Sequence, residues 1–172
     1  MKEDQAREEA AIRVSINIAV APDELFQIFV EDVDLWWKRG PAHRFFPPWK
    51  GRMRFEKNGE TRLVEQDPDN PKRRHVIGEV LVWEPGVHLA FEFRLPNFSR
   101  EQATRVDVSF VPIETGTRIE LVHTGWETLP ADHPAHHGLA GHALIMMKAQ
   151  NWAGNLEALK TYATQETGGR HE

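Results

Sequence analysis

His123 is the residue of this 172-residue chain whose type and position best suit chemistry. It follows Ile119 and Leu121 at a spacing of two, so in a strand all three side chains point to one face. A histidine on an apolar inner face can act as a general acid or base, or can orient an oxygen atom of a ligand. It can equally be a buried histidine whose ring is satisfied by protein groups such as a backbone carbonyl. The sequence leaves both interpretations open.

A second group of histidines gathers around Pro134, near the start of a long apolar segment: His133, His136, His137 and His142. His133 and His137 are four residues apart, a spacing that can share a metal ion on a helix. Pro134 disfavours a helix through His133, and no His-Glu-x-x-His pattern occurs. We therefore expect a solvated helix start and no metal ion, and whether this cluster binds anything stays open.

Recognisable catalytic signatures are absent from the sequence. It contains no Gly-x-Ser-x-Gly elbow, no phosphate-cradling glycine loop and no dinucleotide fingerprint. It also has no cysteine, which excludes disulfides and thiol nucleophiles. The strand acids fall on the polar parity and are expected on the outer face: Glu56, Glu65, Glu79, Glu92 and Glu120. We therefore expect no cofactor, and a protein that is not an enzyme is favoured over one that is.

Large aromatic and methionine side chains recur where one face of a sheet would meet a helix. Together with His123, these residues form the expected ligand-binding set: Trp36, Trp37, Phe55, Phe91, Phe93, Phe110, Met146, Met147 and Trp152. Aromatic rings and flexible methionines suit an adaptable apolar pocket. The same residues could instead fill a solid core, and the pattern alone does not separate the two.

The elements that would position these residues begin with a strand. Apolar residues alternate with polar ones from Ile12 to Val20, which predicts a half-buried strand. Pro22 then opens a helix, and a second short helix carries Leu35-Trp36-Trp37. From Gly51 to about Thr124, alternating segments joined by short turns predict an antiparallel meander.

A long helix ends the predicted order of elements. Residues 137–164 contain no proline and carry apolar residues at helical spacing. The fold class is therefore α+β, with two short helices after the first strand. We expect a polar tail at 1–11, a single domain at 12–165 and a C-terminal tail at 166–172.

Composition limits the function classes further. A net charge of −5 and a pI near 6.0 argue against nucleic acid as a partner. The apolar runs are far shorter than the ~20 residues that span a bilayer, so no membrane insertion is expected. The charged N-terminus has no apolar signal core, which favours a cytoplasmic location. A homodimer stays open.

Four segments in order resemble the SRPBCC superfamily (START-like, birch-pollen-allergen-like), in its branch of heat-shock protein 90 ATPase activator homologues. They are Ala21-Pro22-Asp23-Glu24-Leu25-Phe26 with the later Leu35-Trp36-Trp37, Ile77 to Gly86, Gly116 to Trp126, and Asn151-Trp152 to Leu159. The resemblance covers roughly residues 12–164. It implies a helix-grip fold, in which a curved antiparallel sheet wraps around a long C-terminal helix with an apolar cavity between them.

For function, the resemblance implies binding of a small hydrophobic or lipid-like ligand in that cavity. The alternatives are a cyclase, dehydratase or hydrolase that uses His123, and a chaperone-associated interaction domain. The eukaryotic co-chaperone is similar to this chain only in its C-terminal domain, and residues 1–11 are too short to supply its other domain. A chaperone partner is therefore not expected.

Overall fold

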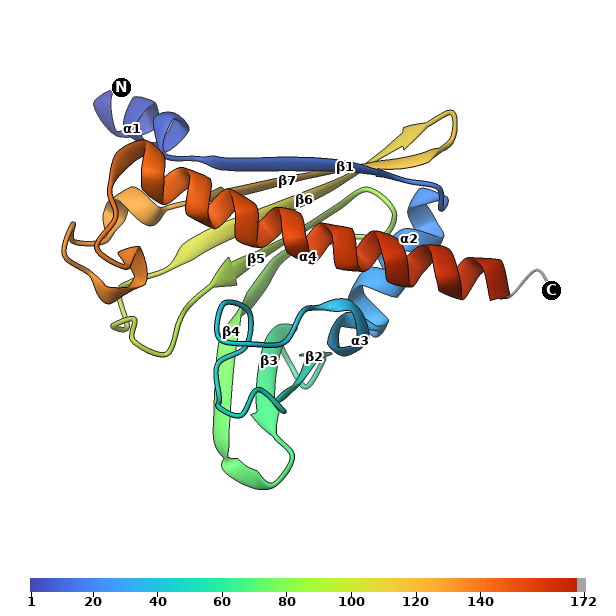
Figure 1. The fold of residues 1–172 in the computed structure, drawn as a ribbon, viewed down its shortest axis with the longest axis horizontal. Coiled ribbons are helices and arrows are strands. Elements are labelled where there is room, and N and C mark those ends of the chain that lie inside the picture. Colours follow the sequence, from blue (N-terminus) through green and yellow to red (C-terminus); the bar gives the residue numbers. More distant parts are fainter. Residues whose placement is uncertain (170–172) are drawn as a thin grey trace.

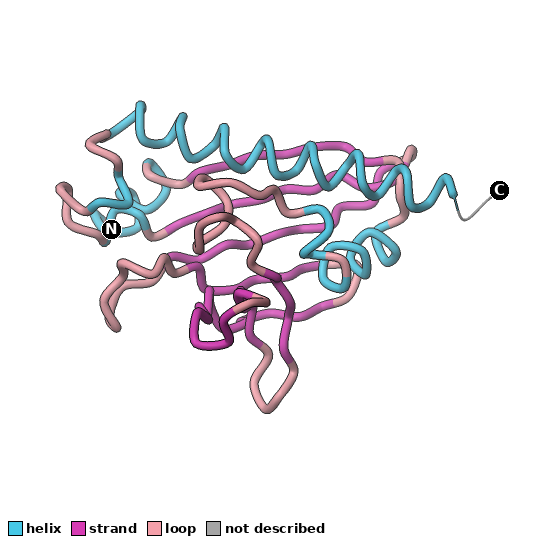
Figure 2. The backbone as a smooth tube through the Cα atoms, turned by 60° about the horizontal axis from the view of Figure 1, so that its bottom comes forward, coloured by secondary structure: helices cyan, strands magenta, loops and turns pink. Residues whose placement is uncertain are grey.

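A curved antiparallel sheet of seven strands carries one long helix across one of its faces (Figures 1 and 2). The computed structural model describes residues 1–169. Its elements are α1 (Lys2–Glu9), β1 (Ile12–Ile18), α2 (Pro22–Glu31), α3 (Val33–Trp36), β2 (Arg52–Glu56), β3 (Arg62–Asp67), β4 (Asn70–Glu84), β5 (His88–Phe93), β6 (Thr104–Ile113), β7 (Gly116–Thr124), two 3-10 turns (Trp126–Thr128 and Pro134–His136) and α4 (Gly141–Gly169). The predicted helix-grip α+β fold is confirmed.

The strand order is β1-β7-β6-β5-β4-β3-β2, so the first strand adds to the edge formed by the last one. β1 pairs with β7 from Ile12 opposite His123 to Ile18 opposite Thr117. In β7, Ile119, Leu121 and His123 are all buried, as their shared parity predicts. The end of β7 lies under the first half of α4, where Trp152 contacts His123.

The sheet bends at β4, which is 15 residues long and pairs with β3 along its first part and with β5 along its second. Register shifts lie at Leu63/Val64 and between Val80 and Val82, and such irregularities increase local bending and twist. Gly78 lies between them, where a Cβ atom would collide with the carbonyl oxygen of Glu92. The close approach of β5 at this point thus requires glycine.

Glu65 is an exception to the predicted outward direction of the strand acids. It is fully buried, while Glu56, Glu79, Glu92 and Glu120 keep at least part of their surface exposed. The register shift breaks the alternation, so that Leu63, Val64 and Glu65 are all buried in succession. The segment after α3 also covers this side of β3, and the Phe45 N–H donates to Glu65 Oε2 at 2.9 Å.

The long helix begins later and ends later than the sequence predicts. Its expected start at His137 is wrong, because His137 (φ 51°) and Gly138 (φ 73°) have left-handed backbone that a helix does not accommodate, and α4 begins only at Gly141. The helix then continues to Gly169, through the first part of the expected C-terminal tail. Residues 170–172 of that tail lie outside the described residues. At the other end, the expected polar tail contains helix α1.

One end of the space between sheet and helices is tightly packed. Phe26 and Phe29 of α2 contact Phe110, with ring centroids 5.2 and 5.9 Å apart. Trp36 packs on Phe29 at 4.7 Å and donates its indole N–H to the Phe29 carbonyl oxygen at 3.0 Å. Here the aromatic side chains form ordinary core. Within residues 1–169, no helix has the length and apolar character needed to cross a membrane.

Candidate functional site

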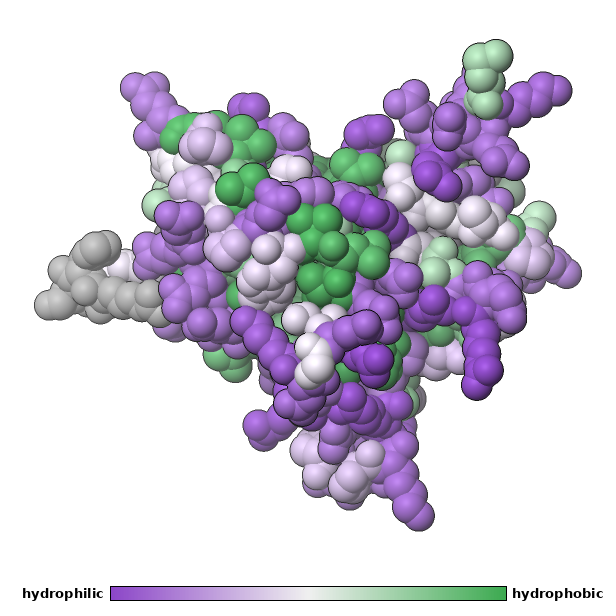
Figure 3. Space-filling model, turned by 180° about the vertical axis from the view of Figure 1, so that it is seen from behind, coloured by the Kyte–Doolittle hydropathy of each residue, from purple (hydrophilic) through white to green (hydrophobic). Residues whose placement is uncertain are grey.

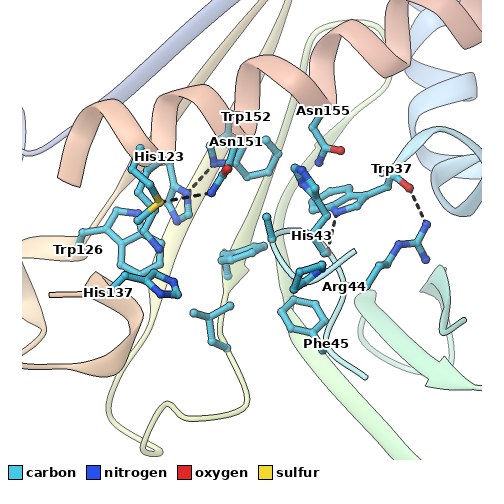
Figure 4. Close-up of a pocket in the computed structure, with 16 residues that line it drawn as sticks. Trp37, His43, Arg44, Phe45, His123, Trp126, His137, Asn151, Trp152 and Asn155 are labelled. Carbon is cyan, nitrogen blue, oxygen red and sulfur yellow. Dashed lines mark hydrogen bonds between the residues drawn. The ribbon is translucent and has the colours of Figure 1, made fainter. Parts of the chain in front are cut away.

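The other end of the interior is hollow. A pocket of about 470 Å³ lies between the first half of α4, strands β5 and β7, and the segment that follows α3 (Figure 4). This volume is above the ~300 Å³ at which small-molecule sites begin. Its lining residues are Trp37, Pro41, Ala42, His43, Arg44, Phe45, Phe93, Leu95, His123, Trp126, His137, Met147, Lys148, Asn151, Trp152 and Asn155.

Five members of the predicted ligand-binding set meet at this pocket: Trp37, Phe93, His123, Met147 and Trp152. Trp152 is the centre of the group. Its ring lies 5.4 Å from that of Trp37, 6.1 Å from Phe93 and 5.9 Å from His123, all in edge-to-face arrangements. The rings hold one another in place and leave an apolar surface toward the hollow. Their role in binding a ligand stays a prediction.

The other five members do not line the pocket. Trp36 and Phe110 belong to the packed end described above. Phe55 and Phe91 contact each other at 6.2 Å, and Phe55 also packs against Trp83. The side chain of Met146 is 44% exposed. Successive helix residues point about 100° apart, so Met147 faces the pocket while Met146 points away.

His123 is fixed by hydrogen bonds on both sides of its ring. The Trp152 indole N–H donates to His123 Nδ1 at 3.0 Å, as Figure 4 shows. An indole nitrogen can only donate, so Nδ1 carries no proton and the hydrogen lies on Nε2. His123 Nε2 is 2.7 Å from Thr104 Oγ1, which in turn donates to the Phe93 carbonyl oxygen at 2.6 Å. A continuous donor chain therefore joins α4, β7, β6 and β5.

This arrangement keeps His123 neutral. Its burial, together with the nearby positive charge of Lys148, lowers its pKa to about 3. Both ring nitrogens are engaged with protein groups, so a proton transfer through this residue requires breaking one of those hydrogen bonds. His123 borders the pocket as the enzyme hypothesis requires, but its geometry is that of a satisfied buried histidine.

Arg44 anchors the segment that closes the pocket opposite α4. Its guanidinium is fully buried and makes five hydrogen bonds, to Asp34 Oδ1 (2.7 Å) and to the carbonyl oxygens of Trp37 (2.7 Å), Gly51 (2.9 Å), Asp34 (3.0 Å) and Lys38 (3.1 Å). An arginine has five N–H donors, so none is left for a ligand. The role of Arg44 is to shape the segment that carries Trp37, His43 and Phe45.

Apart from Trp37, sequence reasoning missed the pocket residues on this segment because it predicted only a loop there. The polar residues on α4 carried a signal that could have been used. Lys148, Asn151 and Asn155 follow one another at spacings of three and four, on the stripe that also carries Trp152. Polar residues that interrupt the buried stripe of a helix indicate a site rather than plain core. Asn155 Oδ1 also accepts the Lys38 backbone N–H at 2.9 Å, which ties α4 to the segment opposite.

The expected solvated start of the long helix is wrong for two of its histidines. His133 and His136 are buried, whereas His137 and His142 are exposed. His133 Nδ1 accepts the Ala135 backbone N–H at 3.0 Å and so caps the short 3-10 turn. Among residues 1–169, no group of three or more histidine or acidic side chains is placed to hold a metal ion.

Trp126 separates the pocket from a second hollow of about 380 Å³ beneath α1. Three buried polar atoms there have no hydrogen-bond partner within residues 1–169: Trp126 Nε1, Glu127 Oε2 and His136 Nε2. Because these atoms are closed off from solvent, a molecule entering this second hollow would meet mainly apolar surface. The pocket under the first half of α4 offers more ordered polar groups, and we treat it as the functional site.

Comparisons with known proteins agree with this architecture. Protein SA2116 of Staphylococcus aureus superposes with a TM-score of 0.61 at 12% identity, over 92% of this chain and 95% of that one. Protein MLL2253 of Mesorhizobium loti gives 0.60 at 17%, over 91% and 98%. The di-domain ARO/CYC StfQ of the steffimycin biosynthetic pathway gives 0.59 at 19%, over 97% of this chain and 55% of that one. At sequence identities this low, the superpositions show a shared fold and nothing further.

Sequence comparison supplies the family. No curated protein matches the chain in sequence. The sequence profile described as "Activator of Hsp90 ATPase homolog 1-like protein" matches residues 19–164, which include every strand from β2 to β7 and the part of α4 that lines the pocket. The chain therefore belongs to the Activator of Hsp90 ATPase homolog 1-like family, with the SRPBCC fold that its sequence resembles.

Proposed function

We propose that this protein binds a small hydrophobic molecule in the pocket under the first half of α4. The observation that carries the proposal is the 470 Å³ hollow itself, lined by Trp37, Phe93, Trp126 and Trp152. Sites of this size with aromatic linings and a few ordered polar groups are typical of small-molecule binding. The family and the shared fold agree with such a role.

An enzymatic role of the cyclase, dehydratase or hydrolase type is the second candidate, because the structural neighbour StfQ is an ARO/CYC protein and His123 borders the pocket. Such a role needs a residue that is free to exchange a proton with substrate. His123 has both nitrogens engaged, and Arg44 has all its donors engaged. These contacts leave neither His123 nor Arg44 free to exchange a proton, which favours binding over a mechanism that uses His123.

A chaperone-associated role is less favoured. A docking surface for another protein is expected to be a broad exposed apolar patch. The face behind the sheet is mostly hydrophilic, with a smaller hydrophobic area at its centre (Figure 3). The exposed large hydrophobic side chains of residues 1–169 come from separate parts of the chain: Met1, Leu35, Leu81, Val87 and Met146.

We also propose a cytoplasmic location for the protein.

Native mass spectrometry of the freshly purified protein tests the binding function. The expected result is a second species heavier than the chain by the mass of one small molecule, which is released when the protein is denatured. If the protein carries no such molecule, and a calorimetric screen of small apolar compounds also finds no binding, the proposed function is wrong.

A further inference from the structure

The charges that line the pocket are of one sign. Within the part of the chain that the structure describes, its lining includes no aspartate or glutamate, although the chain has more acidic than basic residues and a net charge of −5. Arg44 and Lys148 carry the positive charges, and the remaining ionisable groups are the histidines His43, His123 and His137. The charge of the pocket lining is thus positive, whereas the net charge of the whole molecule is negative.

Of the positively charged side chains that line the pocket within residues 1–169, Lys148 has donors to spare and Arg44 has none. The five donors of Arg44 are all used within the protein, and His123 is neutral with both nitrogens engaged. His43 is neutral near pH 7, because burial and the charges of Lys38 and Arg44 lower its pKa to about 4. An anion in the pocket would therefore interact chiefly with Lys148.

The ammonium group of Lys148 is buried and only partly satisfied. Its Nζ donates to the Ala135 carbonyl oxygen at 2.9 Å and lies 4.0 Å from the centroid of the Trp126 ring. A lysine has three N–H donors, and within residues 1–169 no carboxylate oxygen forms an ion pair with this one. A buried charge without a counter-charge is costly to maintain.

A bound molecule can supply the missing counter-charge. We propose that the pocket selects an amphipathic ligand with an apolar body and one anionic group, of the carboxylate or sulfonate kind, and that Lys148 Nζ binds this group. The proposal rests on the binding function above and adds the chemical class of the ligand. The apolar body would lie against Phe93 and Trp152, and the anionic group would lie toward the Trp126 side of the pocket.

Asn151 supplies a second polar contact on the same helix. It lies three residues after Lys148, so both side chains project from one face of α4, and both line the pocket. Asn151 Nδ2 donates to Met147 Sδ at 3.5 Å, and a thioether sulfur is a weak acceptor. A ligand oxygen that takes over this donor would gain a stronger hydrogen bond.

Two fluorescent probes that differ by one anionic group test the proposal. They are 8-anilino-1-naphthalenesulfonate, which is anionic, and N-phenyl-1-naphthylamine, its neutral counterpart. Both are titrated against the wild-type protein, Lys148→Met, and the control Lys160→Met, which removes an exposed lysine from the same helix. Lys148→Met should weaken binding of the anionic probe about tenfold and leave binding of the neutral probe within a factor of two. Lys160→Met should change neither.

The outcomes separate this inference from the proposed function. If neither probe binds the wild-type protein, the proposed function fails. If both probes bind and Lys148→Met weakens neither or weakens both equally, the pocket binds ligands but does not select an anion through Lys148. Should Lys148→Met fail to fold, the wild-type protein still provides a test, because the anionic probe must then compete with a saturated fatty acid and not with its methyl ester.

Discussion

His123 is held in one tautomer by a donor on one side and a hydroxyl on the other. The Trp152 indole fixes Nδ1 as the acceptor, and the Thr104 hydroxyl accepts from Nε2. Protonation of Nδ1 would place two donors face to face in a buried site. The residue thus contributes to stability in its neutral form, and its burial, together with the nearby charge of Lys148, lowers its pKa to about 3.

This pKa predicts a specific loss of stability in acid. Above pH 6.5, His123 is neutral in both the folded and the unfolded chain, and its contribution is complete. Between about pH 6.5 and 3 the unfolded chain binds a proton there that the folded protein does not, so the free energy of unfolding falls as the pH falls. The expected slope from this residue is about 1.4 kcal/mol per pH unit.

Urea unfolding of the wild-type protein and of His123→Gln at pH 6, 5 and 4 measures this contribution. Glutamine can still accept from the indole and donate to the hydroxyl, but it does not titrate. The stability difference between the two proteins should therefore shrink as the pH falls. A difference that stays constant across this range contradicts the account, as does a nitrogen NMR signal of the His123 ring that titrates between pH 6 and 7 in the wild-type protein.

Whether the position of a single residue could be predicted from the sequence depended on the pattern that surrounds it. The parity of β7 placed His123 correctly on the inner face, because a spacing of two fixes the direction of a strand side chain. The sequence could not tell that its ring was satisfied, since Thr104 and Trp152 come from other elements. Lys148 was overlooked for a different reason, because a lysine on a long helix is usually exposed.

At the scale of elements, the segment between α3 and β2 forms the wall of the pocket opposite α4. Residues 37–51 form no helix or strand, and their backbone polar groups need partners from side chains. Arg44 supplies donors to four backbone carbonyls, and Asp34 Oδ1 accepts both from Arg44 and from the Met53 N–H at 2.9 Å. The shape of this segment therefore depends on the buried Arg44 guanidinium and on its partly exposed partner, Asp34.

Arg44→Lys tests this dependence. A lysine keeps the charge but has fewer donors and cannot reach the same set of carbonyl oxygens, and each buried acceptor left without a donor costs about 1–3 kcal/mol. We expect a loss of about 3 kcal/mol in the free energy of unfolding, measured in urea, and faster proteolysis within residues 37–51. The control is Arg39→Lys, which also removes contacts with Asp34 and the Gly51 carbonyl but from a side chain that is 47% exposed.

The control substitution should cost less than about 1 kcal/mol, as exposed ion pairs do. Equal losses for the two variants would mean that burial of Arg44 is not what holds the segment in place.

The order and type of the helices and strands could be predicted from the sequence, because hydrophobic periodicity indicates them directly. The conformation of residues 37–51 could not be predicted, because it depends on hydrogen bonds from Arg44 to residues whose sequence shows no periodicity.

At the scale of the whole molecule, the interior has two unlike halves. Under α2 and α3 the aromatic rings of Phe26, Phe29 and Phe110 fill the space between sheet and helices. Under the first half of α4 the side chains do not meet, and the 470 Å³ pocket is left. The sequence predicted the apolar set as a whole but not its division, because packing and non-packing aromatic residues have the same pattern. This is why Trp36, Phe55, Phe91 and Phe110 of the predicted ligand-binding set pack outside the pocket.

The most direct measurement is a titration of N-phenyl-1-naphthylamine against the wild-type protein, Asn151→Phe and Met146→Phe. Asn151 lines the pocket, so the larger ring should fill it, while Met146 on the same helix is exposed and serves as the control. We predict a dissociation constant of about 10 µM for the wild-type protein and for Met146→Phe, and binding at least about tenfold weaker for Asn151→Phe. A wild-type protein that does not bind the probe, or an Asn151→Phe variant that binds it as tightly as Met146→Phe, would contradict the claim that this pocket is a ligand site.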